Sequence, residues 1–167
     1  MAVFDQQKDL LYVLSLSDFV AKTMIQYPHE CAQLIADGAL ESPFYSLDIT
    51  DEINERIVPN ISDSELKKRL RILRRVHMVP IAWRDLTGKA DIEEVFVSLS
   101  NLAEGIVCRT IDVVRASMET AFGQAYDKQG AVMPLLVLGM GKLGGGELNF
   151  SSDIDLICCY PYDGQTT

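Results

Sequence analysis

The chain lacks any long apolar run, and its first residues do not form a basic stretch followed by an apolar segment. A membrane-spanning helix needs about 20 mostly apolar residues, and a secretory signal needs a basic start before an apolar segment. The sequence therefore predicts a soluble, cytoplasmic protein that has no membrane partner.

Cysteine and histidine are also scarce. The four cysteines form no C-x-x-C pair and none of the two-plus-two spacings that hold zinc. Cys158 and Cys159 are adjacent in a segment typical of a buried strand, so we interpret the cysteines as free core thiols, which suit a reducing cytoplasm. His29 and His77 are isolated from other metal-ligating residues, and we expect structural roles for both.

The chain has no excess of positive charge. Lys plus Arg is 15 against 24 Asp plus Glu, giving a net charge of −9. Phosphate backbones require a basic face, so we expect no nucleic-acid partner. Residues 60–90 are an exception, with eight basic and three acidic side chains. We interpret this segment, with Arg74, Arg75 and Arg84, as a solvated helix face; the alternative is a surface beside a phosphate-bearing ligand or partner.

What is present is a strong helical pattern. Hydrophobic residues make up 48% of the chain, which is enough for a buried core. Apolar residues recur at helical spacing in three segments, and the connection over 38–60 has room for a short helix. The predicted helices cover residues 15–37, with an interruption at Pro28, residues 62–86 and residues 92–122.

The starts of the second and third helices carry capping patterns. Ser62 and Glu65 form an S-x-x-E capping box, and Asp91 is followed by Glu94 at the same spacing. Pro80 lacks a backbone N–H and is expected to kink or restart the second helix. Trp83, on the apolar stripe of that helix, is expected in the core.

The hydrophobic pattern changes after residue 130. Residues 134–138 and 154–160 are short apolar runs typical of buried strands, and a glycine-rich linker lies between them. The predicted fold class is therefore α+β, with a mainly helical region over 1–130 and a strand–turn–strand unit over 131–167. Because two strands do not form an independent sheet, we expect the natural protein to continue beyond Thr167.

The glycine-rich linker contains G-x-G-x-x-G, formed by Gly139, Gly141 and Gly144. A dinucleotide-binding unit requires a crossover helix after the third glycine and an acidic residue at the end of the next strand. Too few residues separate Gly146 from Asp153 for such a helix. A Walker A loop does not fit either, because the spacing before Lys142 is wrong and no Ser or Thr follows it.

Asp153 and Asp155 suggest a different chemistry. Alternate side chains of a strand point to the same face, so D-x-D presents two carboxylates together. Nucleotidyl transfer needs a divalent metal such as Mg²⁺, which prefers oxygen ligands. Glycines let backbone N–H groups approach phosphates. The sequence therefore favours a metal-dependent phosphate site over a pair of aspartates in a simple turn.

This layout resembles the DNA polymerase beta-like nucleotidyltransferase superfamily, in which a small residue pair precedes D-x-D or D-x-E. Here Gly141-Lys142 and ten further residues precede Asp153, and Lys142 departs from the usual Ser or Gly. The longer string GMGKLGGGELNFSSDIDL resembles the bacterial glutamine synthetase adenylyltransferase family. The resemblance extends upstream to SDFV at 17–20, RILRRVHMVPIAWRDL at 71–86 and LSNLAEGIV at 99–107.

The resemblance implies roles for particular residues. Asp153 and Asp155 would be catalytic metal ligands for Mg²⁺, and a third carboxylate would lie beyond Thr167, so we expect this chain alone to be inactive. The residues expected to bind nucleotide or phosphate are Gly141, Lys142, Gly144, Gly145, Gly146 and Ser152. For the glycines the alternative is a tight turn, and for Lys142 it is a surface lysine. Asn149 is expected to fix the loop backbone.

The family has two nucleotidyltransferase halves. One attaches AMP to a tyrosine of glutamine synthetase, and the other removes it by phosphorolysis, releasing ADP. Gly146 and the sequence Ser151-Ser152-Asp153 favour the N-terminal, adenylyl-removing half. The implied partners are glutamine synthetase, the PII signalling protein, adenine nucleotide and phosphate. The alternatives are the attaching half and a non-catalytic module that binds glutamine synthetase or PII.

Overall fold

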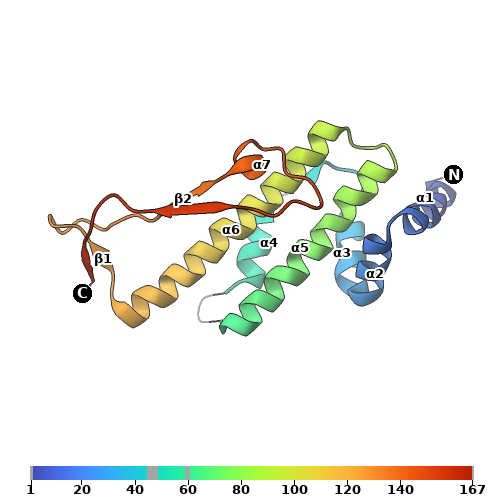
Figure 1. Ribbon diagram of the computed structural model, residues 1–167. Helices are drawn as coiled ribbons and strands as arrows, with labels where there is room; N and C mark the ends of the chain where they lie inside the picture. The colour runs from blue at the N-terminus through green and yellow to red at the C-terminus, as the bar shows by residue number, and fades with distance from the viewer. Residues whose placement is uncertain (1, 45–48, 59–60, 167) are drawn as a thin grey trace.

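The computed structural model describes residues 2–44, 49–58 and 61–166. Helices fill the first three quarters of the chain, and two small antiparallel sheets follow (Figure 1). This arrangement confirms the predicted α+β fold with its helices at the N-terminus. The helices are α1 Ala2–Leu16, α2 Asp18–Gln26, α3 Pro28–Ala36, α4 Ile49–Arg56, α5 Asp63–Leu86, α6 Ile92–Phe122 and α7 Gly141–Gly144. The strands are β1 Ala125–Tyr126, β2 Leu136–Gly139, β3 Leu156–Cys159 and β4 Gln165–Thr166.

Side-chain caps fix the starts of three helices. The hydroxyl oxygen of Ser17 accepts the N–H of Val20 at the start of α2, and that of Ser62 accepts the N–H of Glu65 at the start of α5. A carboxylate oxygen of Asp91 accepts the N–H of Glu94 at 2.8 Å at the start of α6. Each bond satisfies an N–H that has no partner within the helix. The capping predictions at α5 and α6 are confirmed.

Other helix boundaries differ from the prediction in part. The predicted helix over 15–37 is two helices, α2 and α3, divided before Pro28 as expected, and α1 precedes them. The short helix that 38–60 had room for is α4, although residues 45–48 and 59–60 of that segment lie outside the described residues. The 24-residue helix α5 does not restart at Pro80. Because the residues from Val76 to Arg84 are all buried, packing holds the helix together despite the lost hydrogen bond.

Helix α5 joins two hydrophobic clusters. One cluster packs α5 against α4 and α6, through residues such as Ile53, Leu73 and Leu99. The other packs the opposite side of α5 against α1–α3 and contains Trp83, which is 3% exposed as expected for a core residue. These clusters bury α5 on two sides and give it a fixed place in the molecule.

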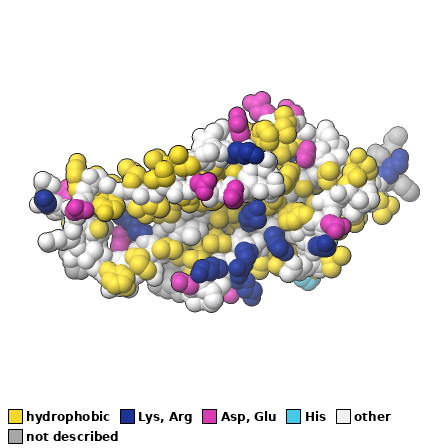
Figure 2. Space-filling model, in the orientation of Figure 1, with side chains coloured by type: hydrophobic (Ala, Val, Ile, Leu, Met, Phe, Trp, Pro, Cys, Tyr) yellow, Lys and Arg dark blue, Asp and Glu magenta, His cyan; other side chains and the backbone are white. Residues whose placement is uncertain are grey.

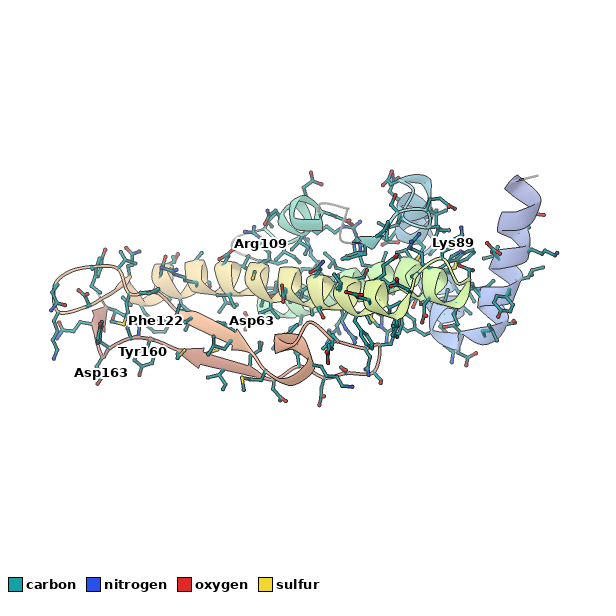
Figure 3. The ribbon with its side chains drawn as sticks, turned by 90° about the horizontal axis from the view of Figure 1, so that it is seen from above. Asp63, Lys89, Arg109, Phe122, Tyr160 and Asp163 are labelled. Carbon is teal, nitrogen blue, oxygen red and sulfur yellow. The ribbon has the colours of Figure 1, made fainter. Side chains whose placement is uncertain are left out.

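The segment that carries the strands β2 and β3 lies along helix α6. Its 31 residues span about 46 Å at 1.5 Å per residue. Seen from above, the β2–β3 pair lies on one side of α6 and the helices α3 and α4 lie on the other (Figure 3). Toward the C-terminal end of α6, Val114, Met118 and Phe122 are exposed, so the predicted apolar face is not covered along its whole length by the described residues.

The two sheets each contain two antiparallel strands. Leu136 pairs with Cys159 and Gly139 with Leu156 in the β2–β3 pair, while β1 pairs with β4. The prediction that these strands are buried is wrong: Leu138 is 52% exposed and Ile157 47%. No further strand or helix among the described residues covers these side chains. Figure 2 shows the resulting apolar surface along the hairpin and a group of basic side chains over α5.

The prediction that the cysteines are buried in the core also needs correction. Cys31 is buried as predicted, but Cys108 and Cys158 are exposed and Cys159 is partly exposed. All four thiols are free. The interpretation of core thiols therefore holds for Cys31 and fails for Cys108, which is exposed on α6, and for Cys158, whose strand is largely exposed.

Candidate active site at the glycine loop

Asp153 and Asp155 lie directly before β3, at the end of the hairpin where β2 finishes. The prediction that Asp155 is inside the strand is wrong by one residue, since β3 begins at Leu156. The backbone N–H of Met140 donates to the carbonyl oxygen of Asp155 at 2.9 Å, so the two chains remain paired just beyond the strand. Both aspartates are exposed. Residues 153–155 lie outside the strand, and the side chains of both aspartates are accessible to solvent.

The glycine string forms the short helix α7 and a turn after it. Gly141 has φ +55° and Gly146 has φ +69°, a backbone region that other residues rarely adopt. A Cβ on Gly144 would clash with the carbonyl oxygen of Gly139 at the end of β2. The N–H of Gly146 donates to the carbonyl of Leu143 at 3.1 Å and closes the turn. Three of the glycines are therefore required by the backbone itself.

The pairing of β2 with β3 also settles the question of a dinucleotide fold. A Rossmann unit joins parallel strands through a crossover helix. Here β2 and β3 are antiparallel, and α7 has four residues. The sequence argument against a dinucleotide-binding unit is confirmed by this topology.

The segment after the glycines is attached to α6. The backbone N–H of Leu148 donates to the hydroxyl oxygen of Ser100 at 3.2 Å, and Leu143 and Leu148 are both buried against the helical core. Asn149 Oδ1 accepts hydrogen bonds from the hydroxyls of Ser152, at 2.6 Å, and Ser151, at 3.3 Å. Asn149 thus fixes this loop as predicted. The predicted contact between Ser152 and phosphate stays a prediction.

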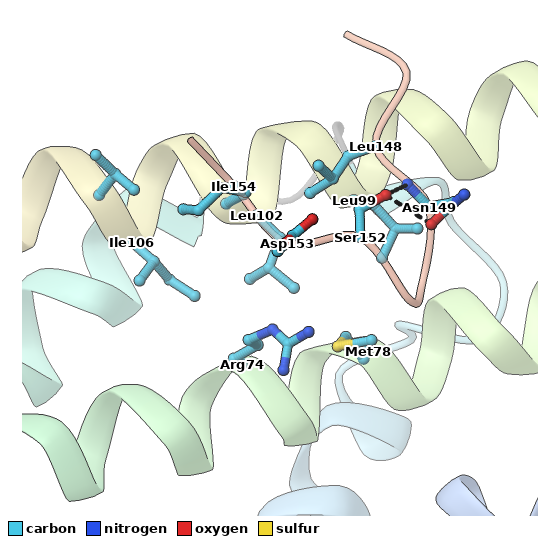
Figure 4. Close-up of a pocket in the computed structure, with 12 residues that line it drawn as sticks. Arg74, Met78, Leu99, Leu102, Ile106, Leu148, Asn149, Ser152, Asp153 and Ile154 are labelled. Carbon is cyan, nitrogen blue, oxygen red and sulfur yellow. Dashed lines mark hydrogen bonds between the residues drawn. The ribbon is translucent and has the colours of Figure 1, made fainter. Parts of the chain in front are cut away.

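A cavity of 260 Å³ lies between α5, α6 and this loop (Figure 4). Its polar lining comes from Arg74 on α5 and from Asn149, Ser152 and Asp153 on the loop. The rest of its lining is apolar, formed by Met78, Leu99, Leu102, Ala103, Ile106, Val107, Leu148 and Ile154. Asp155 and Lys142 are not part of this lining, although both are exposed on neighbouring segments.

The three arginines that we interpreted as a solvated face have different environments. Arg74 and Arg75 are exposed, and Arg75 donates to Gln26 at 3.3 Å. Arg84 is 7% exposed and forms an ion pair with Glu94, so the prediction of a solvated side chain is wrong there. It lies on the side of α5 that faces α6, and the charge of Glu94 compensates its burial.

The histidines lie away from the glycine loop. His77 is buried, and its Nε2 lies 3.0 Å from a carboxylate oxygen of Glu52 on α4. This close contact with His77 is the main cause of the lowered pKa of Glu52, with the charges of His77 and Arg56 adding to it. The structural role predicted for His77 is supported, whereas His29 is exposed on α3.

The structure therefore brings the two aspartates, the glycines and Ser152 to one end of the hairpin. Within residues 2–44, 49–58 and 61–166, no group of three or more His, Cys, Asp or Glu side chains is placed to hold a metal ion. The described chain places two exposed carboxylates, Asp153 and Asp155, at this end of the hairpin. None of its described helices is long and apolar enough to cross a membrane.

Comparisons with known proteins support the resemblance. The family model described as glutamate-ammonia ligase adenylyltransferase matches residues 7–167. Proteins described as bifunctional glutamine synthetase adenylyltransferase/adenylyl-removing enzyme are 40% identical in Shewanella oneidensis and 38% identical in Psychromonas ingrahamii, each over 96% of this chain. The protein with that description in Thioalkalivibrio sulfidiphilus is 38% identical over 94% of the chain. The chain spans 16% to 17% of the length of these relatives.

Proposed function

Because the chain belongs to the glutamate-ammonia ligase adenylyltransferase family, we propose that Asp153 and Asp155 form part of a polymerase-beta-like nucleotidyl-transfer site. The observation that carries this proposal is the position of both aspartates. They are exposed at the end of an antiparallel strand pair, next to a glycine loop held in one conformation. No structural contact of either carboxylate within the described residues accounts for them.

The two aspartates suit Mg²⁺ by their donor chemistry. Magnesium prefers oxygen ligands and commonly binds one or two protein carboxylates together with substrate phosphates. Asp153 and Asp155 would hold the ion, and a third carboxylate would come from another part of the full protein. When bound, Mg²⁺ would neutralise negative charge on the phosphates of the substrate. Because the proposed site needs this third carboxylate, we expect the 167-residue chain by itself to be inactive.

The reaction that we propose is the removal of AMP from an adenylylated tyrosine of glutamine synthetase. An oxygen of inorganic phosphate forms a bond to the adenylyl phosphorus, and the bond from that phosphorus to the tyrosine oxygen breaks. The tyrosine oxygen takes up a proton, and ADP leaves. Gly146 and Ser151-Ser152 before Asp153 support this half of the reaction, because they resemble the adenylyl-removing pattern.

Other residues of the loop would bind the adenine nucleotide and phosphate. The glycines at 141, 144, 145 and 146 leave room for phosphate oxygens to approach the backbone of the loop closely. The N–H groups of Gly144, Gly145 and Gly146 donate to backbone carbonyls, so these three residues would contribute room for the phosphate and Gly141 would contribute its N–H. Lys142 is exposed on α7 and would add a positive charge. The Ser152 hydroxyl donates to Asn149, so it would change partner in order to donate to a phosphate oxygen.

The names of the relatives support glutamine synthetase as the protein substrate, and the PII signalling protein is proposed as a regulatory partner in the cytoplasm. The first alternative is attachment of AMP from ATP at this same carboxylate pair. The second is a non-catalytic module that binds glutamine synthetase or PII. The exposed D-x-D pair favours an enzymatic role over such a module.

The test uses the full-length natural protein, unchanged and with Asp153→Asn plus Asp155→Asn. Adenylylated glutamine synthetase, Mg²⁺ and phosphate are supplied, and ADP release is followed. We expect the double variant to lose ADP release and to keep AMP attachment. Loss of attachment with removal intact would assign this site to the other half. Survival of both activities would reject the nucleotidyl-transfer site and favour the interaction module.

A further inference from the structure

Arg74 is the basic side chain in the lining of the cavity that Asp153 and Ser152 also line. Figure 4 shows Arg74 and Asp153 on opposite sides of this cavity, Arg74 projecting from α5 and Asp153 from the loop before β3. On either side of Arg74, Leu73 and Val76 are buried in the helical core. The backbone beneath Arg74 is therefore held in place, although its side chain is exposed.

Arg74 has no hydrogen-bond or ion-pair partner within the described part of the chain, unlike most of the other arginines. Four arginines pair with glutamates of the protein, one donates to a backbone carbonyl and one to a glutamine. These are Arg56, Arg69, Arg84, Arg115, Arg109 and Arg75. Arg71 resembles Arg74 in having no such partner, but it does not line the cavity.

The surroundings of Arg74 suit an anion. A guanidinium presents several N–H donors in a planar fork that matches the oxygens of a phosphate, and it keeps its charge at all physiological pH values. The remaining walls of the cavity are mostly apolar, so charge interactions inside it are screened less than on an open surface. Asp153 is not within ion-pair distance of Arg74 in the described structure, so the guanidinium remains available.

We propose that Arg74 is a substrate-binding residue that holds a phosphate group across the cavity from Asp153. This inference rests on the proposed function, since it needs Asp153 to belong to the reacting centre. The phosphate is either inorganic phosphate, the co-substrate of AMP removal, or a phosphate of the nucleotide. The positive charge of Arg74 then offsets part of the repulsion between the anion and Asp153.

The experiment uses the full-length protein with Arg74→Gln, Arg74→Lys and, as the matched control, Arg71→Gln. The KM for inorganic phosphate is measured in AMP removal, and the KM for ATP is measured in AMP attachment. We expect Arg74→Gln to raise the KM for phosphate at least tenfold and Arg74→Lys to restore part of the loss, because lysine keeps the charge without the fork. Arg71→Gln should match the unchanged protein.

A second readout does not depend on turnover. Phosphate that binds the folded protein raises its melting temperature, and this rise should be smaller in Arg74→Gln than in Arg71→Gln. Melting curves without phosphate also show whether each variant folds. If Arg74→Gln does not fold, Arg74→Lys carries the test, with an expected rise in the KM for phosphate.

The outcomes separate the two proposals. A raised KM for phosphate supports Arg74 with inorganic phosphate as its ligand. A raised KM for ATP alone supports Arg74 with the nucleotide as its ligand and assigns this site to the attaching half, against the proposed reaction. Unchanged KM values and an unchanged thermal shift in Arg74→Gln overturn the inference. If Asp153→Asn still abolishes AMP removal in that case, the proposed function stands without Arg74. If Asp153→Asn retains both activities, the proposed function has failed, and the thermal shift alone decides whether Arg74 binds phosphate.

Discussion

The hydroxyl oxygen of Ser100, in the first third of α6, accepts the backbone N–H of Leu148, and both residues are buried. This bond attaches the loop that carries Ser152 and Asp153 to the helical core. Replacement of Ser100 by alanine would leave a buried N–H without a partner, which costs about 1–3 kcal/mol. We expect Ser100→Ala to lower the free energy of unfolding by that amount, measured by urea denaturation.

Ser98 is the matched control for this experiment. It is as buried as Ser100 and lies on the same helix, but it lines a different, very small cavity between α5 and α6. Ser98→Ala should be distinctly less destabilising than Ser100→Ala. Equal losses in the two variants would mean that the bond to Leu148 does not hold the loop.

Arg84 and Glu94 form a two-pronged ion pair between α5 and α6. Nε of Arg84 donates to Oε1 of Glu94 at 2.7 Å and Nη2 to Oε2 at 3.1 Å, while Nη1 donates to the carbonyl of Leu40. Arg84→Met would leave the half-buried Glu94 carboxylate unpaired and should cost about 3–5 kcal/mol. Adding Glu94→Leu should recover part of this loss in thermal unfolding. A double variant less stable than Arg84→Met would contradict this explanation.

Glu52 makes stability depend on pH. Its pKa is lowered, first by the close contact with His77 and then by the charges of His77 and Arg56. A carboxyl with a lowered folded-state pKa contributes stability above its unfolded-state value of about 4.3, and this contribution is lost as pH falls through the folded-state pKa. Glu52→Gln should therefore destabilise the protein at neutral pH and flatten the loss of stability below about pH 4.3.

The measurement is the free energy of unfolding as a function of pH for the unchanged protein, Glu52→Gln and Glu55→Gln. Glu55 is an exposed neighbour on the same helix and serves as the control. We expect the Glu55→Gln curve to follow that of the unchanged protein. A Glu52→Gln curve parallel to the other two across the acid range would refute the role given to Glu52.

Gly144 and Gly145 are adjacent but differ in the room around them. A Cβ on Gly144 would clash with the carbonyl of Gly139, whereas a Cβ on Gly145 would meet ordinary contacts at 3.6 Å or more. Gly144→Ala should displace α7 from the end of β2 and lower the free energy of unfolding, while Gly145→Ala should leave the free energy of unfolding close to that of the unchanged protein. Urea denaturation compares the two variants, and equal losses in both would count against the close contact.

The local features of this fold were predictable from the sequence. Capping at Ser62 and Asp91 and the extent of α6 follow from short-range patterns, since both depend on residues three or four positions apart. The continuity of α5 through Pro80 was not predictable, because it depends on burial against helices distant in sequence. The burial of Arg84 was missed for the same reason: its partner Glu94 lies on the next helix, across a turn.

The candidate site was predictable in composition but not in geometry. The D-x-D pair and the glycines stand out in the sequence, yet the start of β3 one residue after Asp155 depends on pairing with β2. Arg74 appeared as one of several basic residues on a helix, and its position in the lining of the cavity comes from the packing of the loop against α5 and α6. A sequence pattern alone does not distinguish it from Arg71.

The bond between Ser100 and Leu148 also bears on the order of folding during synthesis. The two residues are 48 positions apart, so at about 5–20 residues per second roughly 2–10 s pass between their additions to the chain. Helices form within microseconds, and α5 and α6 are joined by a short connection. The helical core can therefore be assembled while the glycine loop is still being translated. The loop, with its two aspartates, then packs against a surface of α6 that has already formed.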